Sequence, residues 1–206
     1  MSERKKIYWD SSCFICLLNK SSEADRMAAC TDVMRHAQGG EFDIVTSTWT
    51  IVEVIRPKKK LGDVPALPEW SELAFEAVPQ CQGQVRRLWD YFHRNTNAPS
   101  QKLTEVQIAA IDAMFSWPCI KLAYLDQRIA SRAVELARDH ELKPPDAVHA
   151  ATAILNKVSE LQRWDRDFNR VADLVRVAEP TIITQQQDLI EGFKKPLLAI
   201  PADAES

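Results

Sequence analysis

The sequence predicts an α/β fold in which a parallel β-sheet is covered by helices. Short β-prone segments alternate with helical segments in the first and last thirds of the chain, and residues suited to capping a helix follow several of the β-prone segments. Hydrophobic residues make up 46% of the 206 residues, which is enough to bury a core. Such alternation is typical of parallel strands joined by helical crossovers.

Two strand–helix units are predicted near the N-terminus. The expected strands cover 7–9 and 42–45, and the helices that follow them cover 13–18 and 49–55. The polar residues Ser11-Ser12 separate the first strand from its helix, and Thr46-Ser47-Thr48 offers caps for the second helix. Pro57 ends that second helix, because proline cannot continue the hydrogen-bond ladder.

The same order returns near the C-terminus. A strand is expected over 119–125, then a helix over 128–140 with Asp126 as its cap, and a second helix from Pro144 to Asn156. The remaining expected strands cover 160–164 and 174–177.

The middle of the chain does not alternate in this way. Between 57 and 103 it carries five prolines and one helical stripe of apolar residues, and a capping box, Thr104-x-x-Gln107, begins a further helix. We interpret 57–115 as a helical insertion or cap within one domain spanning 1–180. A C-terminal extension covers 181–206.

Charge and composition exclude several classes of protein. With 26 basic and 29 acidic residues the net charge is −3, so the chain is neither histone-like nor wholly disordered, and nucleic acid would have to bind at local basic patches. No cleavable leader and no apolar run long enough to cross a bilayer are evident, which predicts a cytoplasmic protein without a membrane partner. We expect the five cysteines, including Cys13-x-x-Cys16, to be buried thiols; a redox or zinc site is the alternative.

Four acidic residues occupy positions where such a sheet would bind a ligand. Asp10 and Asp165 each follow a predicted strand and Asp146 begins a helix, and open α/β sheets bind ligands at the carboxyl ends of their strands. Glu53 lies in a helix among apolar neighbours, where an unpaired carboxylate is costly to bury. Each residue alone has a structural interpretation: a cap for Asp10 or Asp146, a turn for Asp165, solvent exposure for Glu53. Together they favour a divalent cation, which removes the repulsion between clustered carboxylates.

The segments around these acids carry a family resemblance. They read IYWDSSCFI over 7–15, STWTIVEV over 47–54, PPDAVHAATA over 144–153 and WDRDF over 164–168. In order and rough spacing they resemble the successive motifs of the PIN-domain ribonucleases, most closely those of the VapC-like toxin branch. The similarity covers 5–56 and 115–180, and the insertion between these regions is longer than that branch usually carries.

The resemblance implies a PIN-like fold and a metal-dependent endoribonuclease that hydrolyses RNA phosphodiester bonds, acting as the toxin of a type II toxin–antitoxin pair. Asp10, Glu53 and Asp146 match the acids that hold Mg²⁺ or Mn²⁺, and Asp165 matches the fourth acidic position. Oxygen-only ligands suit these cations better than zinc. A homodimer and an antitoxin protein are the further partners implied.

Three other positions refine or weaken this match. Ser12 matches a hydroxyl that supports the first aspartate, and Asp167 is a candidate helper two residues after Asp165. The family usually has a threonine where this chain has Arg163. That departure leaves open the alternative of a catalytically inactive PIN-like scaffold that binds RNA or a protein.

Candidate RNA contacts lie close to the acids in sequence. The basic cluster Arg56, Lys58, Lys59 and Lys60 directly follows the helix that carries Glu53, and it is either an RNA-backbone contact or a solvated helix end. His149, one turn after Asp146, is either a buried histidine, which we favour, or a phosphate contact. Trp164 either stacks on an unpaired base or packs in the core.

Overall fold

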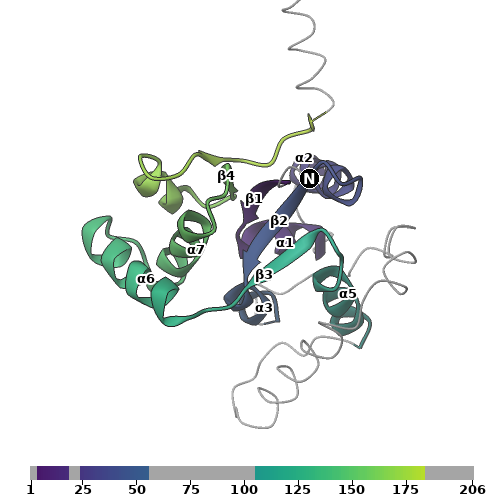
Figure 1. Ribbon diagram of the computed structural model, residues 1–206. Helices are drawn as coiled ribbons and strands as arrows, with labels where there is room; N and C mark the ends of the chain where they lie inside the picture. Colours follow the sequence, from purple (N-terminus) through teal and green to yellow (C-terminus); the bar gives the residue numbers. More distant parts are fainter. Residues whose placement is uncertain (1–3, 19–23, 56–104, 184–206) are drawn as a thin grey trace, which may run out of the picture.

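Five parallel strands form the centre of the structure, a computed structural model that describes residues 4–18, 24–55 and 105–183 (Figure 1). The strands are β1 Lys5–Trp9, β2 Phe42–Ser47, β3 Ile120–Ala123, β4 Glu160–Gln162 and β5 Val177–Ala178, in the order β3-β2-β1-β4-β5. Every neighbouring pair is parallel. The predicted parallel sheet is therefore confirmed, and β1 lies at its centre.

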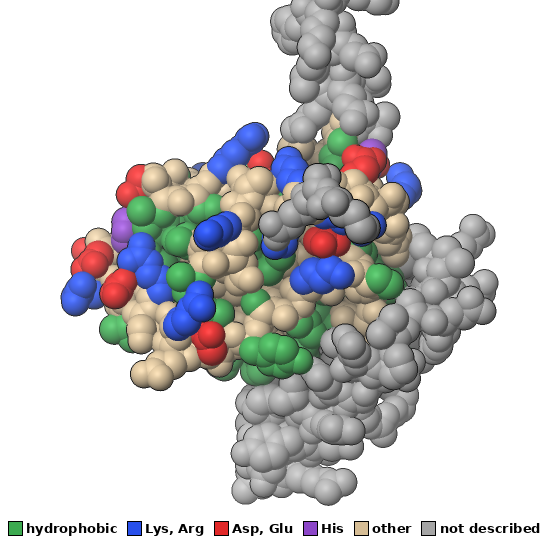
Figure 2. All heavy atoms as spheres, in the orientation of Figure 1, with side chains coloured by type: hydrophobic (Ala, Val, Ile, Leu, Met, Phe, Trp, Pro, Cys, Tyr) green, Lys and Arg blue, Asp and Glu red, His purple; other side chains and the backbone are tan. Residues whose placement is uncertain are grey.

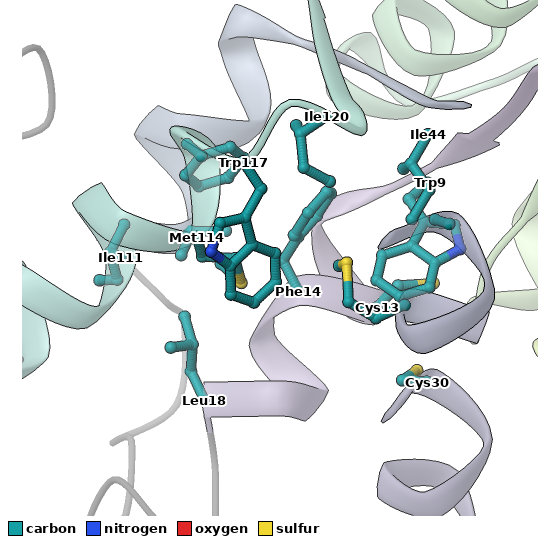
Figure 3. Close-up of a cluster of buried hydrophobic side chains, with 14 of the residues drawn as sticks. Trp9, Cys13, Phe14, Leu18, Cys30, Ile44, Ile111, Met114, Trp117 and Ile120 are labelled. Carbon is teal, nitrogen blue, oxygen red and sulfur yellow. The ribbon is translucent and has the colours of Figure 1, made fainter. Parts of the chain in front are cut away.

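Helices cover both faces of this sheet (Figure 1). The helices are α1 Ser11–Leu18, α2 Ala24–Gln38, α3 Thr48–Ile55, α5 Glu105–Phe115, α6 Gln127–Asp139 and α7 Pro144–Leu155, with a 3₁₀ helix η2 at Arg166–Val171. The first four supply buried side chains to one core, which we call the first core, and the last three to a second core on the opposite face. Figure 3 shows part of the first core.

The side chains of β1 divide between these two cores. Ile7 and Trp9 pack in the first core, whereas Tyr8 packs in the second, and all three are at most 3% exposed. Successive side chains of a strand point to opposite faces, so a central strand covered on both sides is apolar throughout. The unbroken run Ile7-Tyr8-Trp9 thus reflects the position of β1 in the middle of the sheet.

Several predicted boundaries are confirmed and others are corrected. Asp126 caps α6, and its side chain accepts a hydrogen bond from the Ile129 amide at 2.9 Å. The strand predicted over 119–125 is shorter, because the Leu125 amide turns to Thr48 Oγ1 instead of the sheet. The strand predicted over 174–177 begins only at Val177, since the amides of residues 174 and 175 bond to the carbonyl of Val171 in a turn.

Two helices are absent from the sequence-based prediction. Helix α2 buries Ala29, Cys30, Val33, Met34 and Ala37, which recur at helical spacing and carried the signal. Gly40 lies just beyond its end with φ +86°, a left-handed conformation that favours glycine. The second is the 3₁₀ helix η2, where Asp165 occupies the cap position.

Part of the predicted insertion is described. Of the range 57–115, only α5 lies within the described residues; it contributes Ile108, Ile111 and Phe115 to the first core. Residues 56–104 and the extension beyond 183 lie outside the described ranges, so the domain boundaries remain a prediction. Within the described residues, none of the helices combines the length and hydropathy needed to cross a bilayer.

The cysteines behave as predicted where they are described. Cys13, Cys16, Cys30 and Cys119 are buried thiols, and burial raises the pKa of Cys13 and of Cys119 to about 11. A thiol with such a pKa remains protonated and acts as a small apolar group. Cys81 lies outside the described residues.

Candidate metal centre

The parallel sheet places the predicted acids on one edge. Asp10 directly follows β1, and Asp165 lies three residues after the end of the neighbouring strand β4. Glu53 lies in α3, the helix that follows β2, and Asp146 lies in the first turn of α7. Because the carboxyl ends of parallel strands share one edge, these acids are brought to the same side of the molecule.

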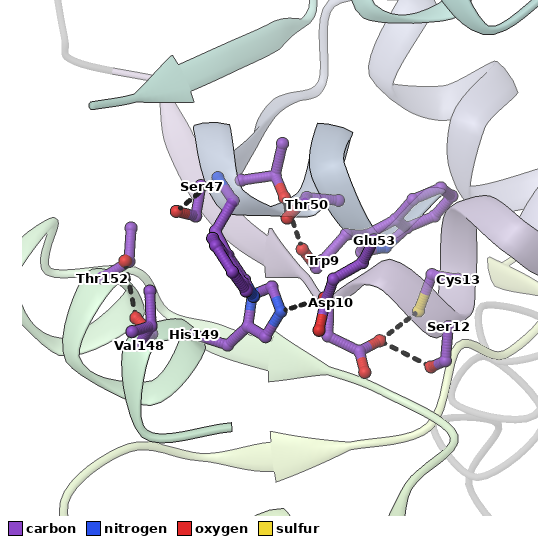
Figure 4. A network of polar contacts seen from close by, with 12 residues as sticks. Trp9, Asp10, Ser12, Cys13, Ser47, Thr50, Glu53, Val148, His149 and Thr152 are labelled. Atoms are coloured by element: carbon purple, nitrogen blue, oxygen red, sulfur yellow. Dashed lines mark hydrogen bonds and ion pairs between the residues drawn. The ribbon is translucent and has the colours of Figure 1, made fainter. Parts of the chain in front are cut away.

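Asp10 and Glu53 form what we call the inner acid pair. Asp10 is 4% exposed, and its Oδ1 accepts hydrogen bonds from Ser12 Oγ at 2.6 Å and Cys13 Sγ at 3.5 Å. The predicted contact between Ser12 and Asp10 is thus present. The Glu53 carboxylate lies between Asp10 and the ring of His149 (Figure 4).

The hydrogen-bond partner of Glu53 is the buried His149 of α7. His149 Nε2 lies 2.7 Å from Glu53 Oε2, and its Nδ1 lies 2.8 Å from the Tyr8 hydroxyl. The Tyr8 hydroxyl oxygen also accepts a hydrogen bond from the Ser47 amide at 3.2 Å. Strands β1 and β2 are therefore connected to α3 through the histidine of α7.

The two members of the inner acid pair have opposite pKa shifts. Burial raises the pKa of Asp10 to about 6; the positive potential of His149 opposes this, and the charge of Glu53 adds to it. Burial also acts to raise the pKa of Glu53, but the hydrogen bond and charge of His149 outweigh it, and the pKa lies below its usual value. Near neutral pH both groups carry negative charge, Asp10 at a cost in desolvation.

Asp146, Asp165 and Asp167 form a second cluster, which we call the outer acid group. Each offers a carboxylate oxygen within 4.8 Å of the others. Burial, followed by the charge of Asp165, raises the pKa of Asp146. Asp165 accepts a hydrogen bond from the Asp167 amide at 3.0 Å, so the turn interpretation of Asp165 also holds.

A lysine partly balances the outer acid group. Lys143 Nζ lies 2.6 Å from Asp167 Oδ2, and this hydrogen bond lowers the pKa of Asp167. Lys143 occupies the cap position of α7 without a side-chain cap bond. Asp146 therefore does not fill the cap position that the structural interpretation assigned to it.

His149 bonds to Glu53 of the inner acid pair and follows Asp146 of the outer acid group by one turn of α7. It is the one residue whose charge acts on Asp10, on Glu53 and on Asp146 among the causes of their pKa shifts. The candidate metal ligands in both clusters are carboxylate oxygens. Glu53 repels Asp10 in the inner acid pair, and Asp165 and Asp167 repel Asp146 in the outer acid group. This chemistry fits a hard divalent cation such as Mg²⁺ or Mn²⁺, for which Asp10, Glu53, Asp146 and Asp165 are candidate ligands.

The other predicted contacts have different outcomes. His149 is 2% exposed and both of its ring nitrogens have partners, as expected for a buried histidine. Trp164 packs against the first core, with the Arg26 guanidinium 4.9 Å from its ring centroid. The basic cluster Arg56, Lys58, Lys59 and Lys60 lies outside the described residues. Lys and Arg intersperse with Asp and Glu on the face seen in Figure 2, in keeping with the small net charge.

Arg163, which stands where the family has a threonine, is a buried structural residue. Its guanidinium is 3.2 Å from Glu179 Oε1 and 2.5 Å from Asn169 Oδ1. The bond to Asn169 connects the end of β4 to η2, the element that Asp165 caps, and the bond to Glu179 connects it to the residue after β5. Arg163 therefore stabilises the segment that carries Asp165 and Asp167, but it does not replace the hydroxyl of the family's threonine.

Sequence reasoning missed three residues that shape the site: Tyr8, Cys13 and Lys143. A tyrosine in a fully buried strand needs a hydrogen-bond partner, which is the signal Tyr8 offers. Lys143 stands immediately before the Pro-Pro-Asp segment, next to two of the acids in space but 24 residues from Asp167 in sequence. Nothing in the sequence distinguished Cys13 from the other buried cysteines.

Comparisons with known proteins identify a family and several similar solved structures. The sequence profile of the PIN domain family matches residues 7–174. A search of curated protein sequences finds no match. Among solved structures, one similar chain belongs to a toxin–antitoxin complex from Klebsiella pneumoniae, with 16% identity, a TM-score of 0.41, and coverage of 84% of this chain and 97% of that chain.

Two further solved structures are similar to a comparable degree. VapBC2 from Rickettsia felis, bound to a DNA fragment from its promoter, has 10% identity and a TM-score of 0.44 over 84% of this chain and 98% of that chain. VapC20 from Mycobacterium tuberculosis, a toxin that cleaves the sarcin–ricin loop, has 15% identity and a TM-score of 0.47 over 83% of this chain and 98% of that chain.

Proposed function

Since this chain belongs to the PIN domain family, we propose that it is a metal-dependent endoribonuclease that hydrolyses RNA phosphodiester bonds. The observation that carries the proposal is the gathering of acids at the carboxyl edge of the sheet. The three oxygens of the outer acid group lie within 4.8 Å of one another, and His149, which bonds to Glu53 of the inner acid pair, also acts electrostatically on Asp146.

The residues of the chain have separate tasks in this reaction. Asp10, Glu53, Asp146 and Asp165 would hold Mg²⁺ or Mn²⁺, which supplies Lewis-acid chemistry for phosphodiester hydrolysis when bound. Ser12 orients the Asp10 carboxylate through its 2.6 Å hydrogen bond, and the Asp10 side chain is shielded from water. Asp167 helps to set the turn that presents Asp165, because its amide bonds to that carboxylate.

Cleavage of total RNA tests this activity directly. The full-length protein should cleave RNA in Mg²⁺ and stop when EDTA is added. Asp10→Asn should abolish cleavage, whereas Asp173→Asn, which removes an exposed carboxylate that belongs to neither cluster, should cleave at the parental rate. An Asp10→Asn protein that cleaves as fast as its parent would eliminate the assignment.

We further propose that the protein is the toxin of a type II toxin–antitoxin pair. Support comes from the four motif segments, whose order and spacing resemble the VapC-like branch. A cognate antitoxin would block the site by placing a basic side chain among the carboxylates, because charge-assisted hydrogen bonds to carboxylates are strong. Isolation of an active, uninhibited nuclease in complex with its neighbour-encoded partner would contradict this role. A homodimer remains a prediction of the same resemblance.

An inactive RNA- or protein-binding scaffold is the second candidate function. Two observations favour it: Arg163 replaces the expected hydroxyl, and Lys143 neutralises part of the outer acid group without any metal. Calorimetry with Mn²⁺ distinguishes the candidates. An enzyme should bind Mn²⁺ and lose this binding in Glu53→Gln, whereas an inactive scaffold should show no Mn²⁺ binding that depends on Glu53.

A further inference from the structure

We propose that His149 is a positioning residue that holds the Glu53 carboxylate in place for the cation, a role that rests on the metal-dependent function proposed above. The histidine is too buried to contact RNA, and its bond to Glu53 distinguishes it from a residue that only packs in the core. It is 2% exposed, and each of its ring nitrogens has a partner from a different element, Tyr8 of β1 and Glu53 of α3.

The packing of the ring fixes where its nitrogens point. The His149 ring meets the rings of Tyr8 and Phe168 edge-on, with centroids 5.9 and 6.3 Å away. Both neighbours are fully buried in the second core. A ring held between two such side chains keeps its orientation, so Nε2 stays directed at Glu53.

The hydrogen bonds also fix which nitrogen donates. An ionised carboxylate only accepts hydrogen bonds, so the 2.7 Å contact between His149 Nε2 and Glu53 Oε2 requires a proton on Nε2. The other nitrogen, Nδ1, lies 2.8 Å from the Tyr8 hydroxyl, which donates to it when the ring is neutral and accepts from it when the ring is charged. The Tyr8 oxygen is itself oriented by the Ser47 amide of β2. A chain of bonds from the sheet thus ends at the Glu53 carboxylate.

This donor meets a specific need of Glu53. Its neighbour Asp10 has Ser12 and Cys13 as donors, both close in sequence, and the two carboxylates repel each other. Without His149, Glu53 would lose its strongest hydrogen bond against this repulsion and keep a weaker one from Ser11. Carboxylates that bind metals are commonly held by such outer hydrogen bonds, and their loss costs about 10–100-fold in metal affinity.

Two substitutions of different length separate positioning from packing. The amide nitrogen of glutamine in His149→Gln can reach the place of Nε2 and donate to Glu53, whereas asparagine in His149→Asn reaches only the place of Nδ1. Mn²⁺ binding to the metal-free, full-length protein is measured by calorimetry, and melting in EDTA reports the stability of each variant. Thr152→Val is the matched control, because Thr152 is buried one turn further along α7 and its hydroxyl donates to the Val148 carbonyl within the same helix.

We expect His149→Asn to weaken Mn²⁺ binding about 10–100-fold, and His149→Gln to recover most of that loss. Thr152→Val should lower the melting temperature and leave the affinity unchanged. Parental affinity in His149→Asn, or an equal loss in both His149 variants, would overturn the inference. If the parent neither binds Mn²⁺ nor cleaves RNA, the proposed function itself fails.

A measurement on the unaltered protein decides the matter should His149→Asn fail to fold. Long-range ¹H–¹⁵N NMR in EDTA should show a proton on Nε2 of His149 that exchanges slowly with water, and its resonance should shift on titration with Mg²⁺. A ring protonated only on Nδ1, or a resonance indifferent to saturating Mg²⁺ in a protein that calorimetry shows to bind it, would refute the positioning role. The EDTA spectrum tests the donor even if no metal binds.

Discussion

The inner acid pair and the outer acid group carry the same functional group in contrasting surroundings. Asp10 is 4% exposed and is held by Ser12 and Cys13, and Glu53 is held by His149. Asp165 is exposed, and the side chain of Asp167 is 35% exposed and bonded to Lys143. The inner pair is therefore fixed by the folded core, whereas the outer group depends on surface contacts that solvent and salt weaken.

The contrast indicates a division of labour. Carboxylates that are largely buried and repel each other gain the most from a cation, because little water compensates their charge; Asp10 is 4% exposed and the Glu53 side chain 22%. Exposed carboxylates gain less, since solvent and Lys143 already compensate them. We therefore expect binding affinity to depend chiefly on the inner acid pair, and the outer acid group to contribute a smaller share.

The largest expected effect is the loss of Mn²⁺ affinity when one acid is removed from each cluster in turn. The two losses test whether the inner acid pair contributes more to binding than the outer acid group. Asp10→Asn should weaken Mn²⁺ binding at least about 100-fold, more than the loss of a supporting side chain would. Asp165→Asn should weaken it by only about tenfold, because its charge is solvated and Asp146 and Asp167 remain. Calorimetry under identical salt compares the two. A larger loss in Asp165→Asn would reverse the proposed order.

Asp10 should also make the metal-free protein less stable as pH rises. Its pKa is raised from 3.8 to about 6, so between these values the folded state binds more protons than the unfolded state. The free energy of unfolding must then fall with increasing pH across this window, by about 3 kcal/mol. Denaturant titrations in EDTA at pH 4 and pH 7 should show this fall in the parent relative to Asp10→Asn. An identical pH dependence in the two proteins would show that burial does not perturb Asp10.

The smallest expected effect concerns Lys143, which tests whether the cation is bound in part by the outer acid group. Its ammonium competes with a cation for the outer acid group, at an exposed site where such pairs contribute about 0.2–1 kcal/mol. Lys143→Met should therefore strengthen Mn²⁺ binding by about two- to fivefold, with the gain shrinking at high salt. Unchanged affinity at low salt would mean that the ion does not approach Asp167, and that Lys143 forms only a surface ion pair with it.

The sequence was most informative where chemistry is local. Alternation of β and α segments predicted the sheet, and the position of Asp10 directly after a strand predicted its place at the carboxyl edge. The bond from Ser12 to Asp10 spans two residues and was equally accessible. Helix α2 carried an apolar repeat but many of its residues are small or polar, so its signal was easily overlooked.

The partners of His149 were beyond the reach of sequence reasoning for a physical reason. Tyr8 lies 141 residues away along the chain and Glu53 lies 96 residues away. Their approach depends on strand order and on the side of the sheet where α7 packs, neither of which a local pattern encodes. The same holds for Lys143 and Asp167, which the turn after β4 brings together. Apolar neighbours of His149 correctly indicated burial but not the role of its nitrogens.

The most direct test of a shared cation site is anomalous diffraction from crystals soaked in Mn²⁺. The account predicts an anomalous peak bonded to a carboxylate oxygen of Asp10 and within reach of Asp146, at the junction of the two acid clusters. A peak held by Asp165 and Asp167 alone, or an ordered site without any peak at saturating Mn²⁺, would contradict it.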